Sequence, residues 1–213
     1  MSNFINRDKL DLYKTSTINH LYPRMNNILP NLWLGDIEAS QDFDALNENE
    51  IHYIVSILAQ KEFHVPTTHH LLITLSDGEP FTNEILTKGV SFIKDAMKRK
   101  ESVLVHCMAG ISRSTTLISA YLMKELHYTP YQAIKFLQEK REIIDPAYFT
   151  FQSAINWVYP NKSMVCKVCN KLWDYREKYE FFLQSKNNDS QRNLKECACK
   201  EPVIIFKDTF PSN

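Results

Sequence analysis

The stretch that decides the fold is Val105-His106-Cys107-Met108-Ala109-Gly110-Ile111-Ser112-Arg113-Ser114. It continues an apolar run at residues 102–106, which predicts a buried strand. It leads into residues 114–126, which are apolar almost all round and predict a buried helix. Backbone N–H groups at the start of a helix bind anions. The sequence therefore predicts a loop that binds a phosphoryl group between a strand and a helix.

The residue types in this loop indicate chemistry on phosphorus. Gly110 can adopt backbone angles that other residues avoid, and Arg113 offers paired donors to two phosphoryl oxygens. The loop amides and Arg113 also favour the thiolate of Cys107, which can attack phosphorus and form a phosphocysteine. We expect Ser114 to donate a hydrogen bond to the sulfur and His106 to orient the loop. The expected phosphate-binding residues are Met108, Ala109, Gly110, Ile111, Ser112 and Arg113.

Two plainer interpretations stay open for this loop. Free cysteine often packs as a small buried apolar residue, and Cys107 can be one. Ser114 can be an ordinary residue at the start of a helix. The combination of strand, Gly110, Arg113 and helix in one register favours the catalytic interpretation of Cys107.

A carboxylic acid is expected near the loop, because the oxygen that a thiolate displaces needs a proton. Residues 75–81 form a polar turn after an apolar strand, and they include Asp77 and Glu79. Asp77 and Glu79 are the two candidates for the general acid. The alternative is that Asp77 only favours the turn before Gly78.

Strands and helices alternate along the rest of the chain. The pattern predicts strands at residues 28–34, 51–58, 70–75 and 102–106, and helices at 38–46, 83–98, 114–126, 130–142 and 147–158. Such alternation predicts an α/β fold with a central, mostly parallel sheet flanked by helices on both faces. In these sheets, sites form at the carboxyl ends of the strands.

Composition narrows the functional class. The 213 residues include 25 basic and 25 acidic side chains, so the charge does not favour a DNA-binding protein. We find neither the run of about 20 apolar residues of a membrane helix nor the apolar core of a signal peptide. The expectation is a cytoplasmic or nuclear protein without a membrane partner.

The loop resembles a known signature. His106-Cys107, five residues and Arg113-Ser114 between a strand and a helix resemble the cysteine-dependent protein tyrosine phosphatases. The Ala-Gly-Ile-Ser-Arg-Ser form resembles their dual-specificity subgroup, as do Ile28-Leu29-Pro30-Asn31-Leu32-Trp33-Leu34-Gly35 and residues 115–123. The resemblance covers residues 25–160. It implies the dual-specificity phosphatase fold and a general acid about thirty residues before the cysteine, where Asp77 lies.

The same resemblance implies an activity. The subgroup hydrolyses phosphotyrosine and phosphoserine or phosphothreonine in proteins, with no catalytic cofactor. Relatives that act on phosphoinositides or RNA 5′ ends often carry extra cations in the loop. The five residues between Cys107 and Arg113 include no Lys and no His, which favours phosphoproteins as substrates. RNA 5′ ends and lipids are the alternative substrates. The usual Asn after Pro146 is replaced by Ala147, which removes an expected helix cap.

The last quarter of the chain has a different character. We divide the chain into an arm at residues 1–24, a catalytic domain at 25–160 and a cysteine-rich tail at 161–213, with a linker at 160–163. The tail carries Cys166, Cys169, Cys197 and Cys199, whose spacing predicts one structural Zn²⁺ held by four thiolates. A disulfide or a redox relay to Cys107 is the alternative.

The tail also suggests a binding function. A zinc-binding tail behind such a domain resembles one phosphatase subgroup that is linked to ribosome assembly through its tail, although those tails usually carry more than four potential ligands. A protein or ribonucleoprotein partner for the tail is therefore expected. The second hypothesis is a tail that serves as a binding scaffold, with catalysis secondary.

Overall fold

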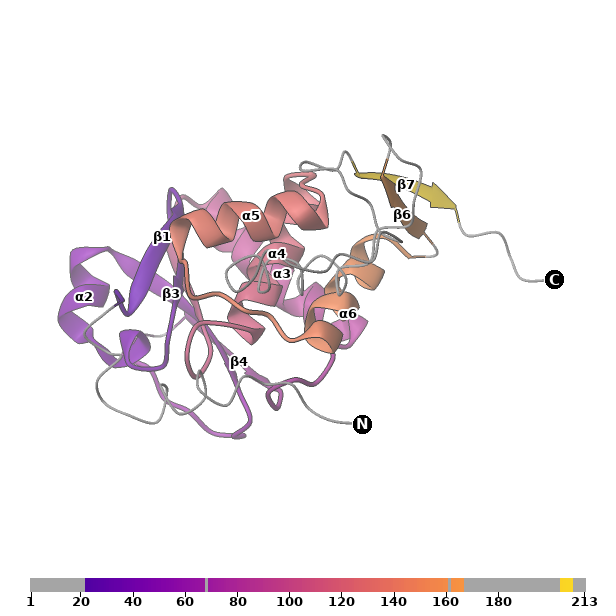
Figure 1. Cartoon of the computed structure of the whole chain (residues 1–213). Coiled ribbons are helices and arrows are strands. Elements are labelled where there is room, and N and C mark those ends of the chain that lie inside the picture. The colour runs from indigo at the N-terminus through magenta and orange to yellow at the C-terminus, as the bar shows by residue number, and fades with distance from the viewer. Residues whose placement is uncertain (1–21, 68, 161, 167–203, 209–213) are drawn as a thin grey trace, which may run out of the picture.

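A five-stranded sheet forms the centre of the molecule (Figure 1). The computed structural model describes residues 22–67, 69–160, 162–166 and 204–208. In the strand order β1-β2-β5-β3-β4, the first pair is antiparallel and the other three pairs are parallel. The strands are β1 (Met25–Leu29), β2 (Leu32–Gly35), β3 (Ile51–Leu58), β4 (His69–Thr74) and β5 (Ser102–His106). The sheet is mixed and mostly parallel, as the alternating pattern predicts.

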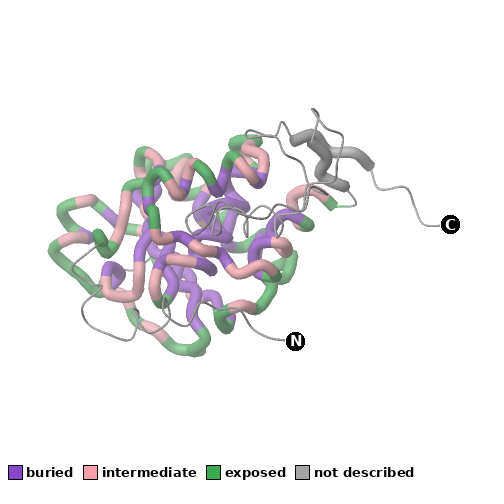
Figure 2. The backbone as a smooth tube through the Cα atoms, viewed as in Figure 1, coloured by how far each residue is buried: buried purple, intermediate pink, exposed green. Residues whose placement is uncertain are grey.

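Helices cover both faces of this sheet. One face carries α3 (Asn83–Lys98), α4 (Arg113–Glu125), α5 (Pro130–Lys140) and α6 (Tyr148–Val158), and the other carries η2 (Ala39–Gln41) and α2 (Phe43–Glu48). Along β5, Val103 and Val105 face the larger helical layer, whereas Leu104 faces the smaller one. Because both faces are covered, the central strand β5 is buried at every residue and β3 is buried from Ile54 to Leu58 (Figure 2). The α/β fold with a flanked central sheet is thus confirmed.

The helix starts are fixed by short polar side chains. Thr82 accepts a hydrogen bond from the Ile85 N–H at the start of α3. Thr129 forms a reciprocal capping pair with Gln132 at the start of α5, just before Pro130. These contacts satisfy N–H groups that have no partner within the helix.

Two expected elements near the N-terminus differ from the structure. The strand predicted at residues 28–34 is two strands, because the chain reverses at Pro30 and Asn31, where Asn31 has a φ of 68°. Asn tolerates this left-handed conformation better than most residues, so a turn is possible there without glycine. The helix predicted at 38–46 is the short turn η2 followed by α2, because Asp42 caps a new helix by accepting from the Ala45 N–H.

The chain beyond α6 forms a small ribbon. Strand β6 (Lys162–Cys166) pairs antiparallel with β7 (Ile204–Asp208), with Cys166 opposite Ile204. The linker predicted at 160–163 is too long, since Lys162 and Ser163 already belong to β6. Cys169, Cys197 and Cys199 lie outside the described residues, as do residues 1–21 of the expected arm.

The described helices are all too short or too polar to cross a membrane. The division into an arm, a catalytic domain and a tail stays a prediction.

Candidate active site

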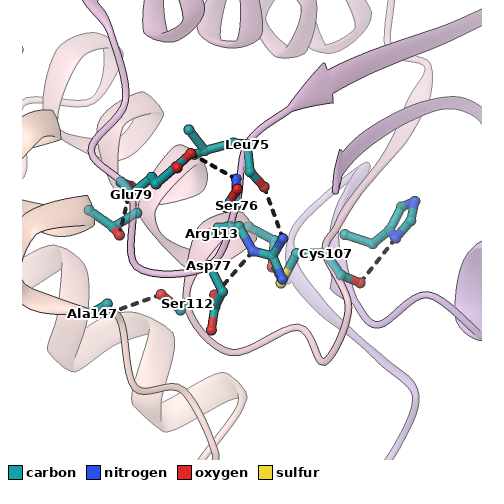
Figure 3. A network of polar contacts seen from close by, with 11 residues as sticks. Leu75, Ser76, Asp77, Glu79, Cys107, Ser112, Arg113 and Ala147 are labelled. Carbon is teal, nitrogen blue, oxygen red and sulfur yellow. Dashed lines mark hydrogen bonds and ion pairs between the residues drawn. The ribbon is translucent and has the colours of Figure 1, made fainter. Parts of the chain in front are cut away.

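The predicted site residues meet at the carboxyl ends of the parallel strands. Cys107 follows the last residue of β5, and the acidic loop (residues 75–81) follows β4. The cysteine loop (residues 107–113) lies between β5 and α4, and its Arg113 begins that helix. Figure 3 shows Arg113, Asp77 and Cys107 together at this edge. The topology thus brings together segments that are thirty residues apart in the chain.

The Cys107 thiol lies on the floor of the cysteine loop and is buried. Burial raises the pKa of this thiol, but the Arg113 guanidinium and hydrogen bonds from Ser114 and Ile111 lower it, and the net pKa is lowered. The Ser114 hydroxyl donates to Cys107 Sγ at 3.3 Å, and the backbone N–H groups of Ser114 and Ile111 also point to the sulfur. The surroundings therefore favour the thiolate, which is the nucleophilic form.

Arg113 is held between the two loops. Its Nη1 donates to the Leu75 carbonyl at 3.1 Å, and its Nε lies 3.1 Å from Asp77 Oδ1 (Figure 3). The latter contact is an ion pair without hydrogen-bond geometry, and among the described residues Nε is a buried donor with no hydrogen-bond partner. Buried donors are rarely left without an acceptor, so this N–H is available to an oxygen of a bound anion.

The two acidic candidates point in different directions. The Asp77 side chain is 69% exposed and faces Arg113. Glu79 instead turns back on its own loop, where its Oε2 accepts from the Ser76 N–H at 3.1 Å. Among the described contacts, the Asp77 side chain pairs with the cysteine loop, at Arg113, whereas that of Glu79 does not. Asp77 is therefore the better candidate for proton transfer there.

His106 lies beneath the loop rather than in it. Its Nδ1 is 3.2 Å from the Cys107 carbonyl oxygen, and its Nε2 is 2.6 Å from Ser56 Oγ, which is 2.9 Å from His70 Nε2. Burial lowers the pKa of His106 to about 4, so the ring is neutral near pH 7. A neutral His106 ring satisfies both of its contacts when Nδ1–H donates to the Cys107 carbonyl and Nε2 accepts from the Ser56 hydroxyl. The same hydroxyl can then accept from His70 Nε2–H. His106 thus links the cysteine loop to β3 and β4.

The remaining residues of the cysteine loop have distinct environments. Met108 is exposed, and its carbonyl accepts from the Ile37 N–H. Gly110 has a φ of +68°, and a Cβ there would lie 2.5 Å from the Gly35 carbonyl oxygen, so only glycine fits. The Ile111 carbonyl accepts from the Asp145 N–H, and the Ser112 hydroxyl accepts from the Ala147 N–H at 2.9 Å. Ala147 therefore keeps a backbone contact with the loop although it lacks a capping side chain.

Sequence reasoning missed Arg141, a buried residue that contacts the cysteine loop. Its guanidinium donates to the carbonyls of Gly110, Ala109 and Pro23 and to the Asn26 side chain, at 2.7–3.3 Å. Two of these contacts hold carbonyls of the cysteine loop itself. A signal existed in the sequence, because Arg141 continues the helical spacing of Ala133, Ile134 and Leu137, although α5 itself ends one residue earlier, at Lys140.

Two further polar residues were missed in buried positions. Ser56 lies in an otherwise apolar stretch of β3, and that break in the pattern is a usable signal. Thr150 is buried in α6 and donates to the Glu79 carbonyl, a contact that the sequence pattern does not indicate.

The arrangement can perform covalent phosphoryl transfer. It combines a buried thiol of lowered pKa, a guanidinium with a free buried donor, and an exposed carboxylate at the same edge. Among the described residues, no group of three or more His, Cys, Asp and Glu side chains is placed to hold a metal ion.

Known proteins resemble the chain over this region. The family model described as "Dual specificity phosphatase, catalytic domain" matches residues 32–157. Human dual specificity protein phosphatase 16 is 38% identical over 124 residues, which are 56% of this chain and 18% of that protein. Tyrosine-protein phosphatase yvh1 of Schizosaccharomyces pombe is 32% identical over 126 residues, 57% of this chain and 38% of that protein. The chain thus spans well under half the length of these two relatives.

A solved structure supports the same relationship. The human tyrosine phosphatase-like serine/threonine/tyrosine-interacting protein superposes with a TM-score of 0.58 at 25% identity, over 63% of this chain and 96% of that one. The family match extends over more than half of the chain and includes every residue of the cysteine loop and the acidic loop. The chain belongs to the dual specificity phosphatase family.

Proposed function

We propose that the protein hydrolyses phosphate monoesters of tyrosine, serine and threonine in proteins through a phosphocysteine intermediate. The observation that carries this proposal is the Cys107 thiol of lowered pKa beside an arginine with a free buried donor. The family assignment supports the reaction class. Cys107 is the nucleophile, Arg113 binds the phosphoryl oxygens, and Asp77 is the general acid.

The first step transfers the phosphoryl group to sulfur. The Cys107 thiolate forms an S–P bond as the P–O bond to the leaving group breaks, and Asp77 gives its proton to the leaving oxygen. Arg113 Nε and the loop amides stabilise the charge on the other three oxygens. Asp77 already lies beside the guanidinium that would hold the phosphoryl group, so the proton has a short path to the leaving oxygen.

The second step hydrolyses the phosphocysteine and regenerates the free enzyme. Water attacks phosphorus, Asp77 accepts the proton from that water, and the S–P bond breaks with its electron pair on sulfur. The hydroxyl and N–H of Ser114 stabilise the thiolate as it leaves. Inorganic phosphate is then released from Arg113 and the loop.

Substrate scope follows from the cysteine loop and from the family. The loop offers one guanidinium and backbone amides, with no Lys or His between Cys107 and Arg113. One phosphoryl group on a protein side chain matches this charge better than a polyphosphorylated lipid or an RNA 5′ end. Family membership supports proteins carrying phosphotyrosine and phosphoserine or phosphothreonine.

Phosphopeptide hydrolysis tests the proposal. We expect wild type to release phosphate from peptides with phosphotyrosine, phosphoserine or phosphothreonine, Cys107→Ser to be inactive, and Asp77→Asn to be slowed by about 100-fold or more. Asp77→Asn should also lose the fall in rate on the basic side of the pH profile, because that fall reports deprotonation of the acid. Rapid release from lipid or RNA phosphates with peptides untouched would replace the proposed substrates with the alternative ones.

For the tail we propose one structural Zn²⁺ bound by Cys166, Cys169, Cys197 and Cys199. Four thiolates are a donor set that zinc prefers. The β6–β7 pairing supports the proposal, because Cys166 lies opposite Ile204 and both cysteine pairs are close in sequence to that end of the ribbon. Cys169 is three residues beyond Cys166 and Cys199 is five residues before Ile204, which limits each separation to roughly 10–18 Å.

Metal content tests the zinc site directly. The full-length protein should carry one zinc per chain, and Cys169→Ser and Cys199→Ser should each lower that content sharply. Ser163→Ala in the same ribbon is the control and should keep the metal. Wild type without zinc, or with a disulfide among these cysteines, would contradict the proposal.

We further propose that the tail binds a protein or ribonucleoprotein partner and that the protein is cytoplasmic or nuclear. A thiolate nucleophile and a cluster of zinc thiolates both require a reducing compartment, which supports this location. Co-sedimentation of full-length protein with ribonucleoprotein particles should be lost in Cys169→Ser, while hydrolysis of a small aryl phosphate persists. Equal co-sedimentation of the variant would remove the tail from this role.

A further inference from the structure

We propose that α6 sets the position of Asp77 through two positioning residues, Thr150 and Ser153, which hold the acidic loop against the cysteine loop. This inference rests on the proposed role of Asp77 as the general acid. Neither Thr150 nor Ser153 touches the sulfur or the guanidinium in any described contact, so each would act only through the loop that it holds.

The C-terminal end of the acidic loop, which leads to α3, is anchored to α6. The Thr150 hydroxyl, which is buried, donates to the Glu79 carbonyl at 2.9 Å. The Phe81 N–H donates to the Ser153 hydroxyl at 2.9 Å, and that hydroxyl in turn donates to the Thr150 carbonyl at 2.6 Å. The two side chains lie one turn apart on α6 and thus fix two backbone positions of the loop, two and four residues after Asp77.

The other side of the acidic loop is anchored to the cysteine loop. The Leu75 N–H donates to the Leu58 carbonyl, which continues the pairing with β3, and the Leu75 carbonyl accepts from Arg113. Between the two anchors lie Asp77 and Gly78, where Gly78 has a φ of +81° and open space around it. The position of the Asp77 carboxylate therefore depends on both anchors.

Helix α6 is itself tied to the cysteine loop. The Asp145 N–H donates to the Ile111 carbonyl at 3.1 Å, and the Ala147 N–H donates to the Ser112 hydroxyl at 2.9 Å (Figure 3). One helix and the residues just before it thus contact both the loop that carries the nucleophile and the loop that carries the acid. This arrangement gives a continuous set of contacts that fixes the separation of the two groups.

The test uses the dependence of rate on the leaving group. A positioned acid makes hydrolysis nearly insensitive to the leaving group, whereas loss of the acid slows a poor leaving group most. The readout is the ratio of kcat/KM for 4-nitrophenyl phosphate to that for phenyl phosphate. We expect a ratio near one for wild type, and ratios raised by about tenfold in Thr150→Val and Ser153→Ala. The ratio should rise further in Asp77→Asn, which removes the acid itself.

Two controls separate positioning from general damage. Thr150→Ser keeps the hydroxyl and should restore the wild-type ratio. Ser119→Ala removes another buried hydroxyl, which donates to the Thr115 carbonyl on α4, and should leave the ratio unchanged. Inhibition by inorganic phosphate should be equal in wild type and Thr150→Val, because the cysteine loop keeps its own contacts.

The double variant Asp77→Asn/Thr150→Val tests whether Thr150 affects the rate through Asp77. If Thr150 acts through Asp77, its substitution adds no further change to the ratio once Asp77 is gone. Ratios that multiply would overturn the proposal, as would wild-type ratios in both Thr150→Val and Ser153→Ala. An unchanged ratio in Asp77→Asn alone would instead overturn the proposed acid, so the two failures are distinguishable.

Discussion

Two buried arginines contact the cysteine loop in different ways. Arg113 lies beside Cys107, and its Nε pairs with Asp77 but has no hydrogen-bond partner among the described residues, so this N–H can still donate to an anion. Arg141 donates to the Ala109 and Gly110 carbonyls. Because these contacts fix two carbonyls of the loop, we expect them to help set the orientation of the loop N–H groups. The first arginine is therefore expected to affect phosphate binding directly, and the second through the shape of the loop.

Replacement of Arg141 should weaken both the fold and phosphate binding. Arg141→Met leaves several buried acceptors without a donor, and each charged hydrogen bond contributes about 1.5–3 kcal/mol. We expect the free energy of unfolding in urea to fall by about 3 kcal/mol or more, and inhibition by inorganic phosphate to weaken. Lys140→Met is the control, because it makes the same charge change one position away, where the Lys140 Nζ lies 5.9 Å from the Phe136 ring centre. It should change the free energy of unfolding and the inhibition by phosphate little.

His106 should make stability depend on pH. Its folded pKa is lowered from 6.5 to about 4, so between these values the unfolded chain binds more protons than the folded chain. The free energy of unfolding should therefore fall as the pH is lowered from 6.5 to about 4, by about 3 kcal/mol from this residue. Urea titrations should show a smaller fall in His106→Asn, whose amide can still donate to the Cys107 carbonyl. Equal falls in both proteins would contradict the neutral buried ring.

At the scale of elements, the helix that follows the cysteine loop is the centre of the packing. Helix α4 is buried along nearly its whole length and lies between α3, α5 and α6. Its approach to α3 is close because Gly89 faces Leu117: a Cβ on Gly89 would lie 2.7 Å from a methyl group of this fully buried leucine. The position of α4, and with it the start of the helix at Arg113, depends on this contact.

Gly89→Ala should therefore destabilise the fold although alanine favours helices by about 1 kcal/mol over glycine. Because Leu117 has little room to move, the overlap should lower the free energy of unfolding by about 1–3 kcal/mol. Urea denaturation measures the effect. In the Leu117→Ala background the overlap is gone, so the same substitution should then be neutral or stabilising. Additive losses would show that the two residues do not compete for space.

The sequence predicted most elements because their signals are local. Helix α3 and strands β3 and β5 have the predicted limits, because the apolar pattern marks all three. In the structure Thr82 caps the start of α3. The turn at Asn31 and the break before Asp42 were missed, because in both places a single side chain changes the course of an otherwise apolar segment. Cys107 and Arg113 were predicted because their residue types suit the chemistry, and Asp77 because it lies where the family resemblance implies the acid; the structure brings the three together.

At the scale of the whole molecule, the strand order brings the site residues together. Strand β5 lies between β2 and β3, so the cysteine loop emerges beside Gly35 on one side and near the acidic loop on the other. Contacts between residues far apart in the chain, such as Thr150 with Glu79 or Arg141 with Gly110, follow from this order and from helix packing. A local pattern can mark Arg141 as a buried residue but does not indicate its partners, and none marks Thr150 or Ser153, so these contacts could not be predicted.

A ligand that binds only the folded site should stabilise the whole molecule. Inorganic phosphate should raise the free energy of unfolding of wild type by about 2.7 kcal/mol when phosphate is at 100 times its Kd. Arg113→Met should abolish this stabilisation, because it removes the charge and the free buried donor. Arg99→Met at the end of α3 is the control and should respond to phosphate as wild type does. Stabilisation of Arg113→Met by phosphate would place the anion elsewhere.

The most direct measurement is to trap the covalent intermediate. Wild type and Asp77→Asn are mixed with an aryl phosphate, quenched in acid during turnover, digested and examined by mass spectrometry, with Cys107→Ser as control. We predict one phosphoryl group on the peptide that contains Cys107, and no modification and no turnover in Cys107→Ser. Turnover by Cys107→Ser at the wild-type rate, with no phosphate on Cys107 in the other two proteins, would contradict the thiolate mechanism.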